Sequence, residues 1–204
     1  MPVLFLCILM LALWIRYESK KNDQVSQCSF ESFWEREKQA NYTRNQPIDH
    51  LPLIQIPLDE LPLKPNATGE LKELQDTLVA LNTQPIIDLS HLTNTELKLT
   101  YGTGHFKYLS ECDANFLTLM NTLNRLAILC EQTELFEDAI TYYEALISYN
   151  DENILTYVRL AKLYHSQNQF DKLLHLKQSL EHSVAKNKNT ILSKIEPLLL
   201  DGSL

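Results

Sequence analysis

Two short groups of residues have the types and the spacing that could support chemistry. The stretch YGTGHF, residues 101–106, holds two of the four glycines in the chain. Closely spaced glycines before a helix can let backbone N–H groups cradle a phosphate. His105 is also followed by Cys112, and a thiol beside an imidazole can act as a nucleophile with its general base.

Neither group completes a catalytic pattern. A dinucleotide-binding fingerprint needs a third glycine and a preceding strand, and a P-loop needs Gly-Lys-Ser/Thr. YGTGHF is followed by no third glycine at that spacing and by no Gly-Lys-Ser/Thr, and the residues before it are predicted to form a helix. The chain also contains no HExxH, no GxSxG and no CxxC motif. We therefore expect a protein that is not an enzyme, with no catalytic residue, cofactor, metal site or small-molecule substrate. Gly102 and Gly104 are interpreted as a helix C-cap and a turn.

Composition narrows the class of protein further. Four glycines among 204 residues indicate helices rather than many tight turns. The net charge of -8 argues against a nucleic-acid partner, because binding nucleic acid needs clustered positive charge. Residues 111–152 hold nine acidic residues and one basic residue, which indicates either a solvated helix face or a charged docking surface. The four cysteines lack a disulfide-framework spacing, which predicts buried free thiols in a reducing compartment.

The N-terminal region predicts a membrane anchor. Residues 2–15 contain no charge, and Arg16, Lys20 and Lys21 follow them. No basic stretch precedes this run and no small-residue cleavage site follows it, so we expect an uncleaved single-pass anchor with the C-terminal body in the cytoplasm. Such a run rises about 21 Å as a helix, whereas the hydrocarbon core is about 30 Å thick. Either the span is longer at its N-terminus or flanking residues snorkel to complete it, and a buried core helix is the alternative.

Between the anchor and the body, residues 29–41 are predicted to form a short helix. This helix carries Phe30, Phe33 and Trp34 as one apolar patch. The patch is expected either to dock on the body of the protein or to lie on a membrane surface.

The next segment predicts an extended strap. In LPLIQIPLDELPL, prolines 52, 57 and 62 recur every five residues, which excludes a regular helix and favours extended backbone. Its leucines and isoleucines are too many to leave in water, so the strap should lie in a groove of the body. Helices are then predicted at 70–81, from the leucine spacing, and from Thr93 to Thr100, where Thr93 and Glu96 have capping-box spacing.

The most informative pattern is an internal repeat within 120–187. A shift of 34 positions aligns Leu126-Ala127 with Leu160-Ala161. The other aligned pairs are Leu123/Tyr157, Arg125/Arg159, Cys130/Tyr164, Ala139/Leu173 and Leu146/Leu180. A small residue lets a neighbouring helix approach closely, and large residues fill the space beside it. A helix–turn–helix unit recurring at this period is typical of stacked helical hairpins.

The first unit, LNRLAILCEQTELFEDAITYYEAL, resembles the tetratricopeptide-repeat (TPR) family in its order of large and small residues. The second unit, YVRLAKLYHSQNQFDKLLHLKQSL, keeps the first helix of this pattern, but Leu173 and Lys177 replace small and aromatic residues in the second, and neither unit has the family's proline. The chain is also similar to uncharacterised clostridial proteins with one N-terminal membrane helix, a TYG-type turn and a repeat pair. These resemblances imply an all-α, TPR-like fold of about two repeats with a terminal cap helix.

We therefore predict four segments. They are an anchor helix (1–17), a polar and helical juxtamembrane segment (18–46), the Pro-rich strap with short helices (47–112), and the TPR-like repeat domain (113–204). The helices expected in the last segment are 114–131, 135–149, 152–166, 170–182 and 189–200, with Asp113 and Asp151 as N-caps and an interruption at Pro197.

By resemblance, the first helix of each unit would line a concave surface that binds a peptide or a protein. The residues predicted on this surface are Asn121, Asn124, Arg125, Ile128, Leu155, Val158, Arg159 and Lys162. Arg125 and Arg159 could bind carboxylates, although the full carboxylate clamp of the family is absent. The sequence thus predicts a membrane-anchored, non-catalytic scaffold or adaptor. The alternatives are a structural subunit of a membrane complex that uses the acidic surface of residues 111–152, or an enzyme without a recognisable motif.

Overall fold

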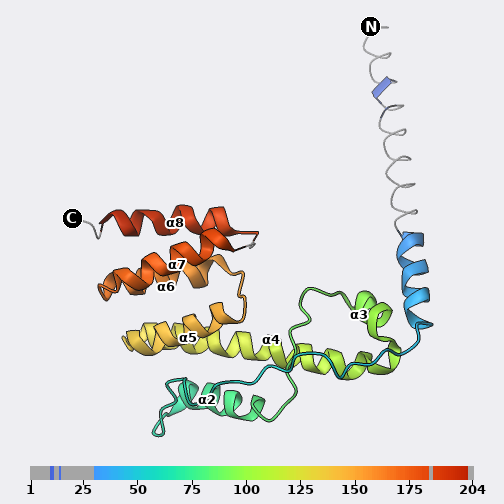
Figure 1. The fold of residues 1–204 in the computed structure, drawn as a ribbon, viewed down its shortest axis with the longest axis horizontal. Coiled ribbons are helices and arrows are strands. Elements are labelled where there is room, and N and C mark those ends of the chain that lie inside the picture. Colours follow the sequence, from blue (N-terminus) through green and yellow to red (C-terminus); the bar gives the residue numbers. More distant parts are fainter. Residues whose placement is uncertain (1–9, 12–13, 15–29, 184–185, 202–204) are drawn as a thin grey trace. The chain divides into compact units, whose positions relative to one another are not determined.

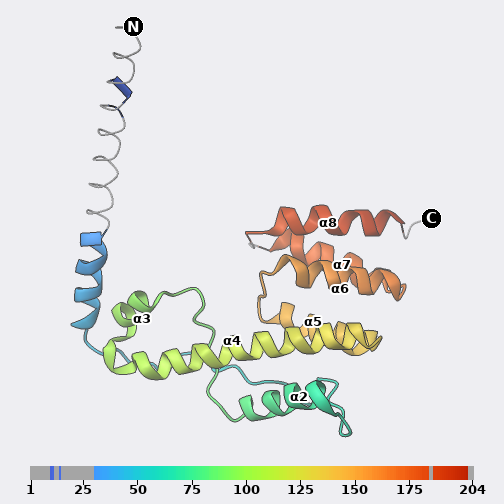
Figure 2. The same ribbon diagram turned by 180° about the vertical axis from the view of Figure 1, so that it is seen from behind.

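The computed structural model describes residues 10, 11, 14, 30–183 and 186–201, and the regular secondary structure of these residues is helical (Figure 1 and Figure 2). The predicted all-α class is therefore confirmed for this part of the chain. Residues 30–41 form a helix. The helices that follow are α2 (Gly69–Leu81), α3 (Asn94–Tyr101), α4 (Thr103–Gln132), α5 (Phe136–Ser148), α6 (Ile154–Ser166), α7 (Phe170–His182) and α8 (Lys188–Asp201).

Most of the predicted anchor, residues 2–15, lies outside the described residues. Met10, Leu11 and Trp14 are described, and all three side chains are exposed. In the part of the chain that the structure describes, no helix is both long enough and apolar enough to cross a membrane.

The chain forms two compact units. The first consists of the described residues up to Leu51 together with Leu89–Glu111, and the second consists of Pro52–Asp88 together with the described residues from Cys112 onward. The first unit therefore contains the helix of residues 30–41, α3 and the first turns of α4. The second unit contains the strap, α2, the rest of α4 and α5 to α8.

In the first unit, the C-terminal half of the helix 30–41 is fixed against α3. Ala40 is fully buried. The Glu37 carboxylate accepts a hydrogen bond from the Thr95 hydroxyl at 2.7 Å and another from the Lys98 ammonium group. These hydrogen bonds stabilise the ionised carboxylate and lower the pKa of Glu37.

α3 begins and ends at the predicted signals. Thr93 and Glu96 form the predicted capping box, in which the Glu96 carboxylate accepts a hydrogen bond from the Thr93 N–H at 2.8 Å and the Thr93 hydroxyl accepts one from the Glu96 N–H at 3.3 Å. Gly102 is the C-cap, and its φ of 84° lies in the region that favours glycine.

α4 runs unbroken from Thr103, so it begins much earlier than the predicted start at residue 114. The prediction of Asp113 as its N-cap is therefore wrong. Gly104 likewise lies in the first turn of α4 and not in a turn between helices. The cap comes from elsewhere in the first unit, since the side-chain oxygen of Asn45 accepts a hydrogen bond from the Gly104 N–H at 2.9 Å. A Cβ atom on Gly102 would lie 2.5 Å from Oδ1 of Asn45, and one on Gly104 would lie closer still to its Nδ2. The two glycines of YGTGHF therefore make room for Asn45.

The second unit contains two helical hairpins, α4–α5 and α6–α7, whose helix boundaries recur at the interval of the sequence repeat. α5 covers 136–148 and α7 covers 170–182, so both bounds are displaced by the same number of positions. The ends of α4 at Gln132 and of α6 at Ser166 are displaced by that number as well. The predicted helices at these positions agree with the structure to within two residues at each of these boundaries.

The loops inside the two hairpins also share one backbone conformation. Each loop has three residues, 133–135 and 167–169, and its middle residue is left-handed, with φ of 59° at Glu134 and 55° at Asn168. In both loops the last N–H donates to the carbonyl five residues earlier, at 2.8 Å. The equivalence of the hairpins therefore extends to the hydrogen bonds of their turns.

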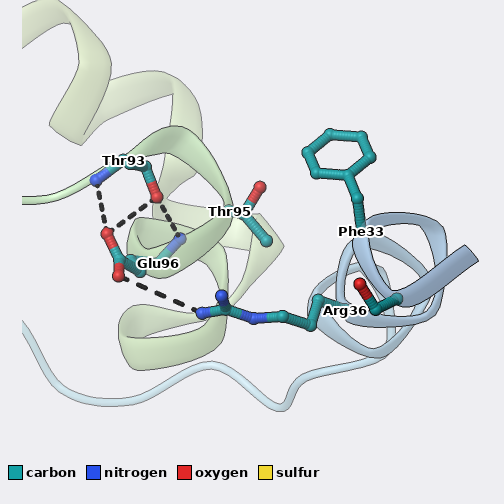
Figure 3. A pocket seen from close by; sticks show the side chains of 6 residues that line it. Phe33, Arg36, Thr93, Thr95 and Glu96 are labelled. Atoms are coloured by element: carbon teal, nitrogen blue, oxygen red, sulfur yellow. Dashed lines mark hydrogen bonds and ion pairs between the residues drawn. The ribbon is translucent and has the colours of Figure 1, made fainter. Parts of the chain in front are cut away.

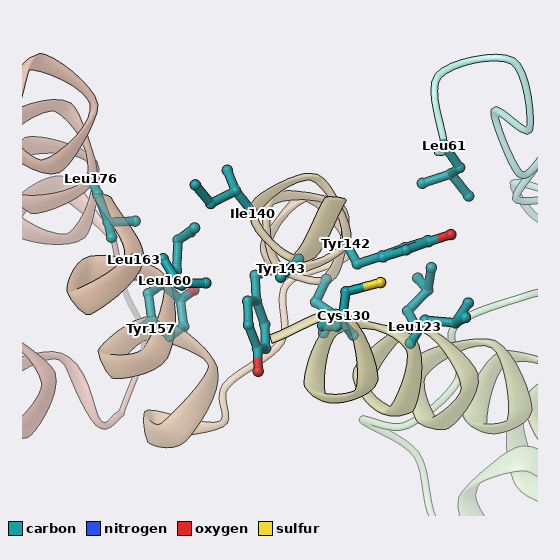
Figure 4. Packing of buried hydrophobic residues seen from close by; sticks show 14 of the residues in the cluster. Leu61, Leu123, Cys130, Ile140, Tyr142, Tyr143, Tyr157, Leu160, Leu163 and Leu176 are labelled. Carbon is teal, nitrogen blue, oxygen red and sulfur yellow. The ribbon is translucent and has the colours of Figure 1, made fainter. Parts of the chain in front are cut away.

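The core of the second unit lies between and within these hairpins (Figure 4). Ala127 of α4 and Ala161 of α6 are fully buried at equivalent positions. Tyr143 of α5 is also fully buried, and Figure 4 shows it extending between α4 and α6. Cys130 is a buried free thiol, as predicted, and desolvation raises its pKa to about 11. Other residues of this core are Leu123, Leu126, Leu146, Leu160, Leu173 and Leu180.

The strap of residues 52–64 contains no helix and lies against α2 and α5. Ile56 and Leu61 are buried in the same core as the hairpins. The Tyr142 hydroxyl of α5 donates a hydrogen bond to the Pro62 carbonyl at 3.3 Å. The strap thus covers apolar surface of α5 that would otherwise face water.

α8 covers α6 and α7 at the other end of the second unit. Ile191 and Ile195 are fully buried there. The predicted interruption at Pro197 is wrong, because α8 continues through this residue. Burial of one face of α8 offsets the hydrogen bond that a proline removes from a helix interior.

Asn153 caps α6, so the predicted role of Asp151 is also wrong. Oδ1 of Asn153 accepts a hydrogen bond from the Leu155 N–H at 3.0 Å. The Asp151 carboxylate instead accepts hydrogen bonds from the Asn153 N–H at 3.0 Å and from the Thr156 hydroxyl at 2.5 Å. Asp151 therefore holds the capping residue in place.

The contact between Asn45 and Gly104 predicts that the effect of Gly104→Ala on stability changes sign when Asn45 is replaced. Gly104→Ala should lower the free energy of unfolding by about 1 kcal/mol, because the new methyl group displaces the capping side chain. In an Asn45→Ala background the same substitution should raise stability by up to about 1 kcal/mol, since alanine is then simply the better helix former. Urea denaturation of the four proteins of this cycle measures both values, and equal effects in the two backgrounds would contradict the contact.

Candidate functional site

The eight residues predicted to bind a partner all lie in the second unit, on α4 and α6. The exposed ones are Asn121, Arg125, Leu155 and Lys162, and the partly buried ones are Asn124, Ile128, Val158 and Arg159. The structure therefore places all eight side chains with some access to solvent.

Arg125 of α4 contacts an acid of the same chain. Its guanidinium group lies 2.5 Å from Oε1 of Glu70, which is in the first turn of α2. The side chains of α2 that face the core, Leu74 and Leu78, are buried. α2 therefore packs within the second unit with Glu70 in reach of Arg125, so this arginine is paired with an acid of the same chain.

Arg159 of α6 is part of a cluster that joins three helices. Nη1 of Arg159 lies 2.9 Å from Oε2 of Glu131 in α4, and the Tyr143 hydroxyl of α5 donates to the same oxygen at 3.0 Å. Burial and the neighbouring carboxylate raise the pKa of Tyr143, so its hydroxyl stays protonated and continues to donate. We call Glu131, Tyr143 and Arg159 the inter-hairpin cluster, because it links the first hairpin to the second.

The two arginines therefore do not meet at one carboxylate-binding site, since each is paired with a different acid of the chain. A narrower part of the predicted surface presents apolar side chains with one lysine beside them. Leu155, Val158 and Lys162 share one face of α6, since they are spaced by three and four residues. Leu155 is 62% exposed, although it is a large apolar residue. We call these three residues the α6 face.

Sequence reasoning missed a groove between α5, α6 and α7. The groove has a volume of about 400 Å³, and its apolar lining consists of Ile147, Leu160 and Leu176. At its edge, Glu144 of α5 accepts hydrogen bonds from the Tyr164 hydroxyl at 2.7 Å and from the Lys172 ammonium group at 3.0 Å. No spacing in the sequence indicates this site, because the acid and the base come from different hairpins. The two charges neutralise one another, so the groove presents a mainly apolar surface.

A second hollow, of about 360 Å³, lies in the first unit between the helix 30–41 and α3 (Figure 3). Arg36 lies 4.0 Å from Glu96 there, and Phe33 forms part of the wall. Glu96 is already held by the capping box, whose hydrogen bonds from Thr93 lower the pKa of this carboxylate. The polar groups of this hollow therefore serve to fix α3 and to orient the helix 30–41.

In the described ranges, no group of three or more His, Cys, Asp or Glu side chains is placed to hold a metal ion. Compared with protein-family models, with curated proteins and with solved structures, the chain gives no match.

We expect Glu131 and Arg159 of the inter-hairpin cluster to be coupled more strongly than the exposed ion pair of Glu70 and Arg125. A double-mutant cycle with Glu131→Gln and Arg159→Gln should give a coupling of about 1 kcal/mol in the free energy of unfolding, because these groups are partly buried and share a hydrogen bond with Tyr143. The matched cycle with Glu70→Gln and Arg125→Gln should give less than about 0.5 kcal/mol, since both side chains are more than half exposed. Equal couplings in urea denaturation would argue against the cluster as a link between the hairpins.

Proposed function

We propose that the protein is a non-catalytic scaffold of tetratricopeptide type, held at the cytoplasmic side of a membrane by residues 2–15, which binds a protein or peptide through the α6 face. The observation that carries the proposal is the recurrence of helix bounds, turn conformation and turn hydrogen bonds from one hairpin to the next at the interval of the sequence repeat. This interval is typical of helical repeats whose surfaces bind other proteins.

The ends of the hairpin stack support a binding role rather than growth by further stacking. The strap and α2 pack at one end, and α8 packs at the other. Apart from Pro197, the exposed described residues of α8, Lys194 and Glu196 among them, are polar. Stacked repeats need such polar caps for solubility, so a capped pair is suited to act as a discrete module.

The α6 face is the part of the predicted surface best suited to a partner. Arg125 and Arg159 are held by acids of the chain itself, which disfavours a clamp for a terminal carboxylate. Leu155 and Val158 instead present apolar surface, with the exposed Lys162 beside them. A partner segment with an apolar anchoring side chain and a neighbouring acid would match this surface.

The membrane attachment is supported by the sequence and by the exposure of its described residues. Residues 2–15 are uncharged and basic residues follow them. Met10, Leu11 and Trp14 are 67%, 55% and 62% exposed, so the described protein does not cover them. A lipid environment would bury these side chains, with Trp14 at the interface.

The alternative, a structural subunit that uses the acidic surface of residues 111–152, has less support. Glu131, Asp138 and Glu144 each pair with a basic residue of the chain itself. These acids therefore contribute to intramolecular packing, and a smaller share of the negative charge remains for a basic partner.

A photo-cross-linking amino acid at position 155 tests the binding role in cells that express the full-length protein. Position 174 on α7 is the matched control, since Leu174 is also an exposed leucine, at 47%. We expect a discrete adduct from position 155 and none from 174, and we expect Leu155→Glu to abolish the association without changing the helical circular dichroism. The same adducts from both positions, or none from 155, would contradict binding at the α6 face.

A further inference from the structure

Three aromatic side chains form an exposed patch at the start of the helix 30–41. Phe30, Phe33 and Trp34 are 61%, 53% and 54% exposed. The Trp34 ring contacts each phenylalanine ring edge to face, with centroids 5.9 Å apart in both cases. The rings therefore form a single preassembled apolar surface, which we call the aromatic patch, and not three scattered side chains.

The rest of the helix is fixed, so the patch has a defined direction within the first unit. Glu37 is bonded to Thr95 and Lys98 of α3, and Ala40 is fully buried. The acids Glu31 and Glu35 are exposed, and at 100° per residue they lie well away from the direction shared by the three rings. The three rings of the helix thus share one side and these two acids lie away from it, so the aromatic surface can meet a membrane without burying Glu31 or Glu35.

We propose that the aromatic patch binds the interfacial layer of the same bilayer that holds residues 2–15. This inference rests on the proposed function, because the anchor keeps the patch close to lipid. Only residues 16–29 separate the apolar run from Phe30, and a chain of that length spans at most about 50 Å. At such a distance even a weak affinity suffices, since tethering makes the second contact intramolecular.

The chemistry of the patch and of the connecting segment favours lipid over a protein partner. Tryptophan and phenylalanine are the side chains that interfacial helices place at the boundary of headgroups and acyl chains. The connecting segment carries Arg16, Lys20 and Lys21 against the acids Glu18 and Asp23, and its net positive charge suits the anionic surface of a cytoplasmic leaflet. The first unit would then be attached to the membrane at two points.

The chain offers a direct test, because Trp14 and Trp34 are its only tryptophans. The Trp14→Phe variant reports on the patch alone, and the Trp34→Phe variant reports on the anchor alone. Each full-length variant is reconstituted in vesicles of phosphatidylcholine and phosphatidylglycerol that carry bromine either near the headgroup or deep in the acyl chains. We expect the shallow bromines to quench Trp34 roughly twofold more strongly than the deep ones, as for a helix lying in the interface.

A second pair of variants distinguishes binding of the aromatic patch to lipid from mere proximity of Trp34 to the membrane. In the Trp14→Phe background, Phe30→Ser with Phe33→Ser should abolish the quenching of Trp34, whereas Tyr42→Ser, at a residue that is 83% exposed, should leave it unchanged. Unchanged quenching after loss of both phenylalanines would overturn the inference. Emission of Trp34 that is blue-shifted but not quenched by lipid would also overturn it, since protein would then cover the patch. Absence of lipid quenching at Trp14 would contradict the proposed anchor, independently of the result at Trp34.

Discussion

Ala127 and Ala161 are buried without any exposed surface at equivalent places in the two hairpins, and the rest of the second unit depends on the close approach of helices that they permit. A larger side chain at either place would push the neighbouring helix away and leave the large residues around it without partners. Tyr143 fills the space beside this contact, and its hydroxyl meets Glu131, which also binds Arg159. Small buried side chains thus recur in the two hairpins, and one polar cluster links the hairpins.

The two ends of the hairpin pair are covered by different elements of the chain. The strap lies along α5 through Ile56 and Leu61 at one end, and α8 lies on α6 and α7 through Ile191 and Ile195 at the other. A pair of hairpins buries too little apolar surface to be stable alone. The strap, α2 and α8 therefore belong to the structural core of the second unit.

The sequence predicted α2, α3 and α5 to α8 well because their signals are local, and the signals of the hairpin helices also repeat. The period of the repeat, the leucine spacing of α2 and the capping box of α3 can each be read from short stretches of the chain. The start of α4 was predicted wrongly because its decisive partner is distant in the sequence. Asn45, which lies far from Gly104 in the sequence, caps α4, and no local rule indicates it.

Distance in the sequence also explains the gaps in the predicted site. The repeat pattern predicts surface residues from their helix positions alone, but the acids that pair with Arg125 and Arg159 come from α2 and α4. The groove edged by Glu144 and Lys172 joins two hairpins and likewise has no local signal. The aromatic patch was visible in the sequence, whereas the hydrogen bonds of Glu37 that fix its helix appear only in the fold.

The measurement that tests the repeat most directly is the stability cost of filling its two small positions. Ala127→Leu and Ala161→Leu should each lower the free energy of unfolding by about 1–3 kcal/mol in urea denaturation, and by similar amounts, because both residues are fully buried at equivalent contacts. Ala80→Leu, at an exposed position of α2, should change stability by less than about 0.5 kcal/mol. A neutral effect at either buried alanine would contradict a pair of equivalent, closely packed hairpins.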